Sequence, residues 1–271
     1  MDLFENTNKI VIGMAQPLAL PGSVRSEGMP LSLIEEKLLE EVALYDKYGY
    51  DSVILQNFHD IPVLRDSTTE AVAYMTRLGC AIKRNFPKML LGILMVWDGC
   101  ASLAVADACG ADYVRVEHCY SGAEMTSTGL LQAQCPEILA MRRRLGSRMP
   151  LYADVFEPHA MPVLPKPIDE ACASAVNECL ADGLFVCGKT AEESLRYGVA
   201  VRKRLPNTPL LLGGGATGDN VFELLKYYDG VCIGTWIKDG SLFNPINPER
   251  VRIFMEQVNR AREWKEACRP S

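Results

Sequence analysis

The chain has 271 residues, of which 48% are hydrophobic and 8% aromatic, and its formal net charge is −6 at pH 7. This length suits one large domain or two small ones, and the apolar share is enough for a large aliphatic core. The negative charge argues against nucleic acid and anionic membrane surfaces as partners, because both select basic faces.

Eight strand-like apolar runs alternate with helical patterns along the chain. The predicted strands are residues 10–15, 52–56, 89–96, 112–118, 151–155, 183–187, 209–212 and 230–235. Their continuously apolar composition is typical of parallel strands buried on both faces, and their spacing fits successive βαβ units. None is long enough to span a membrane.

Helix-start signals precede several of the predicted helices. SLIE at 32–35, STTE at 67–70 and TAEE at 190–193 have the capping-box pattern, in which the first and fourth side chains bond each other's backbone N–H groups. NP at 247–248 supplies a cap and a first-turn proline for the last helix.

Eight strands alternating with eight helices predict a single (β/α)8 barrel, or TIM barrel, over residues 1–271. A doubly wound open sheet is the competing architecture, but it usually has fewer strands and carries its glycine fingerprint after the first one. Here the first strand is followed by GMAQPLALPGS, which is not G-x-G-x-x-G. The barrel is therefore favoured, and this fold commonly forms homo-oligomers.

The lengths of the connections indicate where the site lies. Helix-to-strand turns are short, whereas the long connections at 16–30, 119–134 and 156–167 all run from strand to helix. Long ordered loops are often functional covers, and active sites of this fold lie on the strand-to-helix side. We therefore expect a site and its cover at the carboxyl ends of the strands.

The two glycine-rich strand ends near the C-terminus predict a phosphate site. Glycines let backbone N–H groups converge on an oxygen-rich anion, and a helix expected to open at Thr217 would add its unpaired N-terminal donors. In TIM barrels this grip is built from the loops after strands seven and eight. The alternative is that the glycines only allow tight turns. The predicted phosphate-binding residues are Gly213, Gly214, Gly215, Gly234 and Thr235.

Three ionisable residues near strand ends are the predicted catalytic groups: Asp154, Glu117 and His159. A carboxylate in an apolar strand such as YADV is costly to bury unless paired, so Asp154 should meet a cation, a donor or a substrate hydroxyl. Arg115 is two residues before Glu117 and points to the same side of its strand. Arg115 could neutralise either carboxylate or hold an anion. The two carboxyl groups could then act as an acid–base pair, or they could form an inert buried ion network with Arg115.

Other polar residues at strand ends are suited to bind substrate. Gln56 and Asn57 offer amides for sugar hydroxyls, although they could instead cap loops through backbone contacts. His59, His118 and His159 all follow predicted strands, where an imidazole can exchange protons near neutral pH. Lys189 and Lys238 could back a phosphate as point charges. The predicted substrate-binding residues are Gln16, Gln56, Asn57, Arg115, His118 and Lys189.

No cofactor is predicted. The ten cysteines contain no C-x-x-C pair, and buried reduced thiols of a cytosolic protein are the expected state. A divalent metal held by His118, Cys119, Asp154 and His159 lacks the short ligand spacing that would support it. The first residues, MDLFENTNK, also lack the pattern of a signal peptide, so a cytoplasmic location is expected.

Several of these motifs together resemble the BtpA/SgcQ family. They are MAQPLALPGS, LQNFHD, RVEHCYSGAEMTSTG, ADVFEPHA, GGGATGDNV and GVCIGTWIKDG. The resemblance covers nearly the whole chain and implies a phosphate-binding barrel. The family is named for a protein needed for photosystem I accumulation, and other members sit among sugar-uptake genes.

The chain departs from the family pattern at four polar positions. Gln16 replaces a histidine, Gln56 a glutamate, and Leu94 and Glu117 each an asparagine. The predicted function is binding and acid–base transformation of a sugar phosphate or nucleoside phosphate, by a lyase, isomerase or glycosidic hydrolase reaction. The alternative is a non-catalytic assembly or stability factor that keeps only the phosphate grip.

Overall fold

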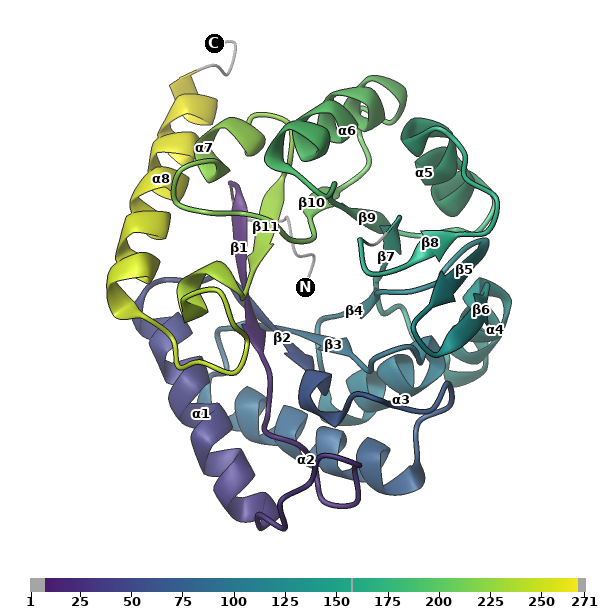
Figure 1. Ribbon diagram of the computed structural model, residues 1–271, viewed down its shortest axis with the longest axis vertical. Coiled ribbons are helices and arrows are strands. Elements are labelled where there is room, and N and C mark those ends of the chain that lie inside the picture. Colours follow the sequence, from purple (N-terminus) through teal and green to yellow (C-terminus); the bar gives the residue numbers. More distant parts are fainter. Residues whose placement is uncertain (1–7, 157, 268–271) are drawn as a thin grey trace.

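The computed structural model describes residues 8–156 and 158–267. Eight parallel strands close into a barrel in chain order, with β1 pairing both β2 and β11 (Figure 1). The barrel strands are β1 (Ile10–Ala15), β2 (Ser52–Gln56), β3 (Leu90–Leu94), β4 (Tyr113–Val116), β7 (Leu151–Val155), β9 (Gly183–Val186), β10 (Leu210–Leu212) and β11 (Gly230–Ile233). The predicted (β/α)8 fold is confirmed.

Helices surround the strands on the outside of the barrel (Figure 1). They are α1 (Leu31–Lys47), α2 (Thr69–Asn85), α3 (Gly99–Cys109), α4 (Cys135–Leu145), α5 (Ile168–Asn177), α6 (Ala191–Arg204), α7 (Val221–Leu224) and α8 (Pro248–Ala267), with short 3-10 turns η1 (Phe58–Asp60) and η2 (Trp236–Lys238). None of these described helices combines the length and apolarity needed to cross a membrane.

Helix starts agree with the sequence signals in part. Thr190 accepts a hydrogen bond from the Glu193 N–H, and Asn247 accepts one from the Glu249 N–H at the start of α8, as predicted. The capping box predicted at 67–70 is shifted by one residue, because Thr68 and not Ser67 caps α2. The box at 32–35 is wrong. There α1 starts directly after Pro30, which places the serine inside the first turn, where it cannot cap.

The barrel interior is filled by aliphatic and aromatic side chains. Tyr113, Tyr152 and Phe185 pack edge to face, with centroid distances of 5.5 and 6.3 Å. A Cβ atom on Gly92 would lie 2.4 Å from the Tyr113 ring, so the glycine makes room for that ring. A second apolar layer, between strands and helices, completes the core.

Two of the long strand-to-helix loops fold into a small antiparallel sheet, which we call the lid sheet. It consists of β5 (Ala123–Thr126) and β6 (Gly129–Gln132), which follow β4, and β8 (Met161–Pro162), which follows β7. Because β4 and β7 are neighbours in the barrel, their loops meet over the same side of the carboxyl-terminal end, hereafter the mouth.

At the opposite end, four aspartates join the strands in pairs. Asp51, Asp112, Asp182 and Asp229 stand directly before β2, β4, β9 and β11. Their carboxylates accept hydrogen bonds of 2.7–3.0 Å from the N–H groups of Val11, Leu91, Leu151 and Leu210, each in the preceding barrel strand. In the same order, each also pairs with a helix cation, namely Arg262, Lys83, Arg142 and Arg202. We call these units aspartate clamps.

Replacing one clamp aspartate should destabilise the barrel. Asp229→Ala leaves the Leu210 N–H and the Arg202 guanidinium without their acceptor, and we expect a loss of about 1–3 kcal/mol in the free energy of unfolding. Urea-induced unfolding measures this loss. The exposed Asp219, whose carboxylate bonds no described residue, is the control, and Asp219→Ala should change stability by less than about 0.5 kcal/mol. Equal effects of the two variants would contradict a clamp.

Candidate functional site

Arg115 on β4 and Asp154 on β7 form a buried ion pair inside the barrel near the mouth. The Nε–Oδ2 and Nη2–Oδ1 distances are both 2.8 Å, and the side chains are 4% and 3% exposed. The guanidinium also lies 4.3 Å from the centroid of the Phe185 ring. Burial acts to lower the pKa of Arg115, but the Asp154 carboxylate outweighs it and raises that pKa well above its usual value. The pairing considered from the sequence is confirmed.

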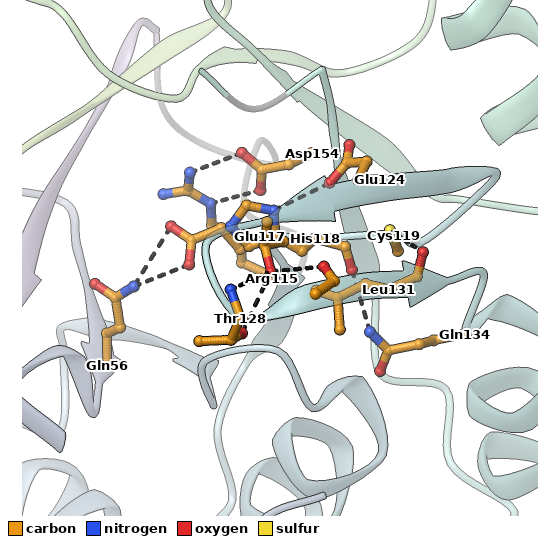
Figure 2. A network of polar contacts seen from close by, with 12 residues as sticks. Gln56, Arg115, Glu117, His118, Cys119, Glu124, Thr128, Leu131, Gln134 and Asp154 are labelled. Atoms are coloured by element: carbon orange, nitrogen blue, oxygen red, sulfur yellow. Dashed lines mark hydrogen bonds and ion pairs between the residues drawn. The ribbon is translucent and has the colours of Figure 1, made fainter. Parts of the chain in front are cut away.

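A relay of side-chain amides leads from this region to β1. Gln56 donates from Nε2 to Glu117 Oε2 at 3.2 Å (Figure 2). Gln16 donates from Nε2 to Gln56 Oε1 at 2.8 Å. An ionised carboxylate only accepts, so Glu117 fixes the direction of both amides. The relay ends at Gln16 Oε1, a buried acceptor with no hydrogen-bond partner among the described residues. This oxygen is shielded from solvent, so the relay ends inside the protein.

His118 joins the tip of β4 to the lid sheet. Its Nδ1 lies 3.0 Å from Oε2 of Glu124 on β5, and both side chains are buried (Figure 2). Gln134 donates to the His118 carbonyl at 3.1 Å, which fixes the other end of the same loop. His118, predicted to bind substrate, thus holds the lid sheet against the barrel.

The glycine loop after β10 borders the ion pair. A Cβ atom on Gly213 would lie 3.3 Å from both Arg115 Nη2 and Asp154 Oδ1, so this glycine permits the close approach. The Gly213 N–H donates to the Val186 carbonyl at 3.4 Å and is therefore already used by the protein. In the loops after β10 and β11, the backbone N–H groups of Gly214, Gly215, Gly234 and Thr235 donate to no described residue.

The helix after these glycines is short, as predicted, but it begins later than Thr217. α7 has four residues and starts at Val221 after Asn220, whereas Thr217 stands in the preceding turn and accepts from the Asp219 N–H. Asn220 accepts from the Thr217 N–H at 2.8 Å and so takes up one of the donors. A helix dipole contributes little to any anion site here, because it grows with the number of aligned peptides.

The remaining predicted residues differ in their burial and in their partners. The Asn57 side chain accepts from the Val96 N–H and donates to Asp60, which favours the loop-capping alternative. Lys189 is exposed after β9, and His159 is exposed in the loop between β7 and β8. Lys238 is 2% exposed and bonds both oxygens of Glu41 at 3.0 and 3.1 Å, so its charge is neutralised.

A second cluster lies at the mouth where the loops after β1, β2 and β11 meet. The His59 ring packs on Phe243 with a centroid distance of 4.9 Å, and Arg25 Cζ lies 6.0 Å from the Phe243 centroid. Burial, reinforced by Lys238 and Arg25, lowers the pKa of His59 to about 4. We call Arg25, His59 and Phe243 the aromatic cluster.

The cluster and the lid contact involve residues that the sequence analysis did not select. Glu124 belongs to a strand of alternating exposure next to a TSTG turn, which is a hairpin signal. No sequence pattern marked Phe243 or Arg25, because the residues in contact are more than 180 positions apart in the sequence. Within residues 8–156 and 158–267, no three His, Cys, Asp or Glu side chains are grouped to hold a metal ion.

Comparisons with known proteins agree with this architecture. The model of the BtpA family matches residues 7–260. An uncharacterized protein of Thermococcus kodakarensis is 33% identical over 94% of this chain and 97% of its own. The photosystem I biogenesis protein BtpA of Synechocystis is 31% identical over 95% of this chain and 91% of its own.

Among solved structures, N-(5'-phosphoribosyl)anthranilate isomerase of Pyrococcus furiosus has a similar fold. Its TM-score is 0.54 at 14% identity, and the match covers 93% of this chain and 99% of the isomerase chain. At this level of identity the similarity shows the barrel fold alone.

Removing one partner of the buried ion pair should cost more than removing both. Asp154→Leu leaves an uncompensated guanidinium in the barrel, and we expect it to reduce the free energy of unfolding by about 3–5 kcal/mol. The double variant Arg115→Met/Asp154→Leu should regain most of that loss. Urea-induced unfolding of both variants checks this, and equal losses would show that the pair is not coupled.

The lowered pKa of His59 predicts a pH dependence of stability. The unfolded histidine takes up its proton near pH 6.5 and the folded one near pH 4, so the unfolded state binds more protons between these values. Stability should therefore fall as the pH decreases from about 6.5 to about 4, and His59→Phe should reduce this slope. Titration of the imidazole resonances by NMR checks the cause, and a folded His59 that titrates near pH 6.5 would contradict it.

Proposed function

The chain belongs to the BtpA family, and on that premise we propose that it binds a sugar phosphate or nucleoside phosphate at the barrel mouth and transforms it by acid–base chemistry. The observation that carries the proposal is the set of buried polar groups at the mouth. The Arg115–Asp154 pair, the amide relay and Glu117 all meet the carboxyl ends of the strands. Buried polar groups are costly unless they are paired, and Gln16 Oε1 at the end of the relay accepts from no described residue.

The phosphate is assigned to the loops after β10 and β11. Gly214 and Gly215 directly follow Gly213, which borders the ion pair, and Gly234 and Thr235 follow the neighbouring strand. Four N–H groups without a described acceptor suit an anion with several oxygens. The isomerase of similar fold is named for a phosphoribosyl compound, which supports a phosphorylated ligand.

Proton transfer is assigned to Glu117 and His159. Both oxygens of Asp154 are bonded to Arg115, so this carboxylate holds the guanidinium and sets the local charge. Glu117 is only half-buried and is oriented by Gln56, so it can exchange a proton with a ligand. His159, exposed on the same side, would be the second group. Lyase, isomerase and glycosidic hydrolase reactions each need one acid and one base.

A non-catalytic role is the competing proposal, because a relative of this chain is named a photosystem I biogenesis protein. The two proposals differ in what Glu117 must do. Glu117→Gln keeps the size and polarity of the side chain and removes its proton chemistry. Full cellular function of that variant would favour the non-catalytic role.

Phosphorylated ligands should stabilise the protein against heat. A ligand at about 100 times its dissociation constant stabilises the folded state by about 2.7 kcal/mol. A thermal-shift panel of ribose 5-phosphate, hexose phosphates and nucleoside monophosphates measures this, with the unphosphorylated sugars and nucleosides as controls. Absence of a shift with every phosphorylated compound would reject the proposal.

A matched pair at Gly214 tests the assignment of the phosphate. Gly214→Pro removes the backbone N–H, whereas Gly214→Ala keeps it, and the added Cβ would meet only Cys187 Sγ at 3.9 Å. Loss of one hydrogen bond to a charged group should weaken ribose 5-phosphate binding about 10- to 100-fold in the proline variant alone. Calorimetric titration gives both affinities. Similar affinities would place the phosphate elsewhere.

A further inference from the structure

The aromatic cluster contains an exposed ring at the mouth. Phe243 is 64% exposed, although it contacts His59 and lies 6.4 Å from the Phe58 centroid. Single exposed apolar side chains are common on protein surfaces, so exposure alone assigns no role. The partners of this ring, however, are an imidazole and a guanidinium carried by two other loops.

His59 supplies a second, independent observation. Its side chain is buried, at 6% exposure for the residue, yet it makes no hydrogen bond to any described residue. Its ring nitrogens are not among the solvent-inaccessible atoms without a partner, so the polar edge of the ring faces solvent at the mouth. A neutral imidazole has one donor and one acceptor nitrogen. Either nitrogen can therefore pair with a donor or an acceptor on a ligand, according to the tautomer.

The cluster lies beside the proposed phosphate loop. Leu242 Cδ2 would be 3.1 Å from a Cβ atom on Gly234, so the loop after β11 folds back on its own beginning. Phe243 is the next residue, so its ring is carried by the same loop as the Gly234 and Thr235 amides. One ligand can therefore reach both features.

We propose that Arg25, His59 and Phe243 form a nucleobase subsite, so that the ligand of the mouth is a nucleoside phosphate and not a simple sugar phosphate. This inference rests on the proposed function. A flat base stacks on the exposed Phe243 ring, and the Arg25 guanidinium adds a second planar contact. His59 pairs with the edge of the base. A sugar phosphate has no aromatic face and would leave these three side chains unused.

The test compares two ligands that share a phosphorylated ribose. Stacking on an aromatic side chain is worth about 5- to 150-fold in affinity per base, so Phe243→Ala should weaken binding of adenosine or uridine 5'-monophosphate by that factor. Binding of ribose 5-phosphate should change less than about twofold, and Phe243→Trp should preserve both. Calorimetric titration measures each affinity.

Phe222→Ala is the matched control. This phenylalanine lies on α7, away from the mouth cluster, and also has an arginine near its ring, with Arg260 Cζ at 4.8 Å from the centroid. It should leave both affinities unchanged. Mononucleotides that bind no tighter than ribose 5-phosphate, or a Phe243→Ala effect of equal size on both ligands, would overturn the subsite while keeping the proposed function. Failure of both ligands to bind the unaltered protein would overturn both.

Discussion

A guanidinium inside a closed apolar barrel requires a carboxylate that meets it with both oxygens, and this constraint organises the mouth. Asp154 provides that partner across the β4–β7 pair. The residue at 213 must then be small, because any side chain would press on the pair. Asp154 is occupied in this way, whereas Glu117 accepts from the amide of Gln56, which in turn accepts from Gln16.

The mouth has two sides that differ in character. Over β4 and β7 the lid sheet is tied down by the His118–Glu124 contact, and the groups beneath it are charged and hydrogen-bonded. Around β1, β2 and β11 the groups are aromatic and basic, and the buried Lys238 is neutralised by Glu41. The glycine loops lie between these sides. A ligand with a phosphate in the middle, a reactive sugar toward Glu117 and a base toward Phe243 fits this division.

The fold could be predicted because strands buried on both faces leave continuous apolar runs, and the strand-to-helix side could be predicted from loop length. Residues at strand ends, such as Asp154 and Gln56, were found for the same reason. The sequence left either Glu117 or Asp154 as the partner of Arg115. The register between β4 and β7 brings Arg115 to Asp154. The sequence did not reveal the roles of Glu124, Phe243 and the four clamp aspartates, because their partners come from other segments of the chain. The capping box predicted at 32–35 was wrong because α1 already starts directly after Pro30.

The aspartate clamps repeat the same three-part joint four times around the lower rim: a helix cation, a strand N–H and the carboxylate before the next strand. The rim thus has an approximate fourfold symmetry that the upper loops lack. Every joint involves one even-numbered helix and two consecutive barrel strands, and the four joints together include all eight strands of the barrel. The loops of the mouth, including the lid sheet, contribute no residue to these joints, so the lower rim is held together independently of the loops that form the candidate site.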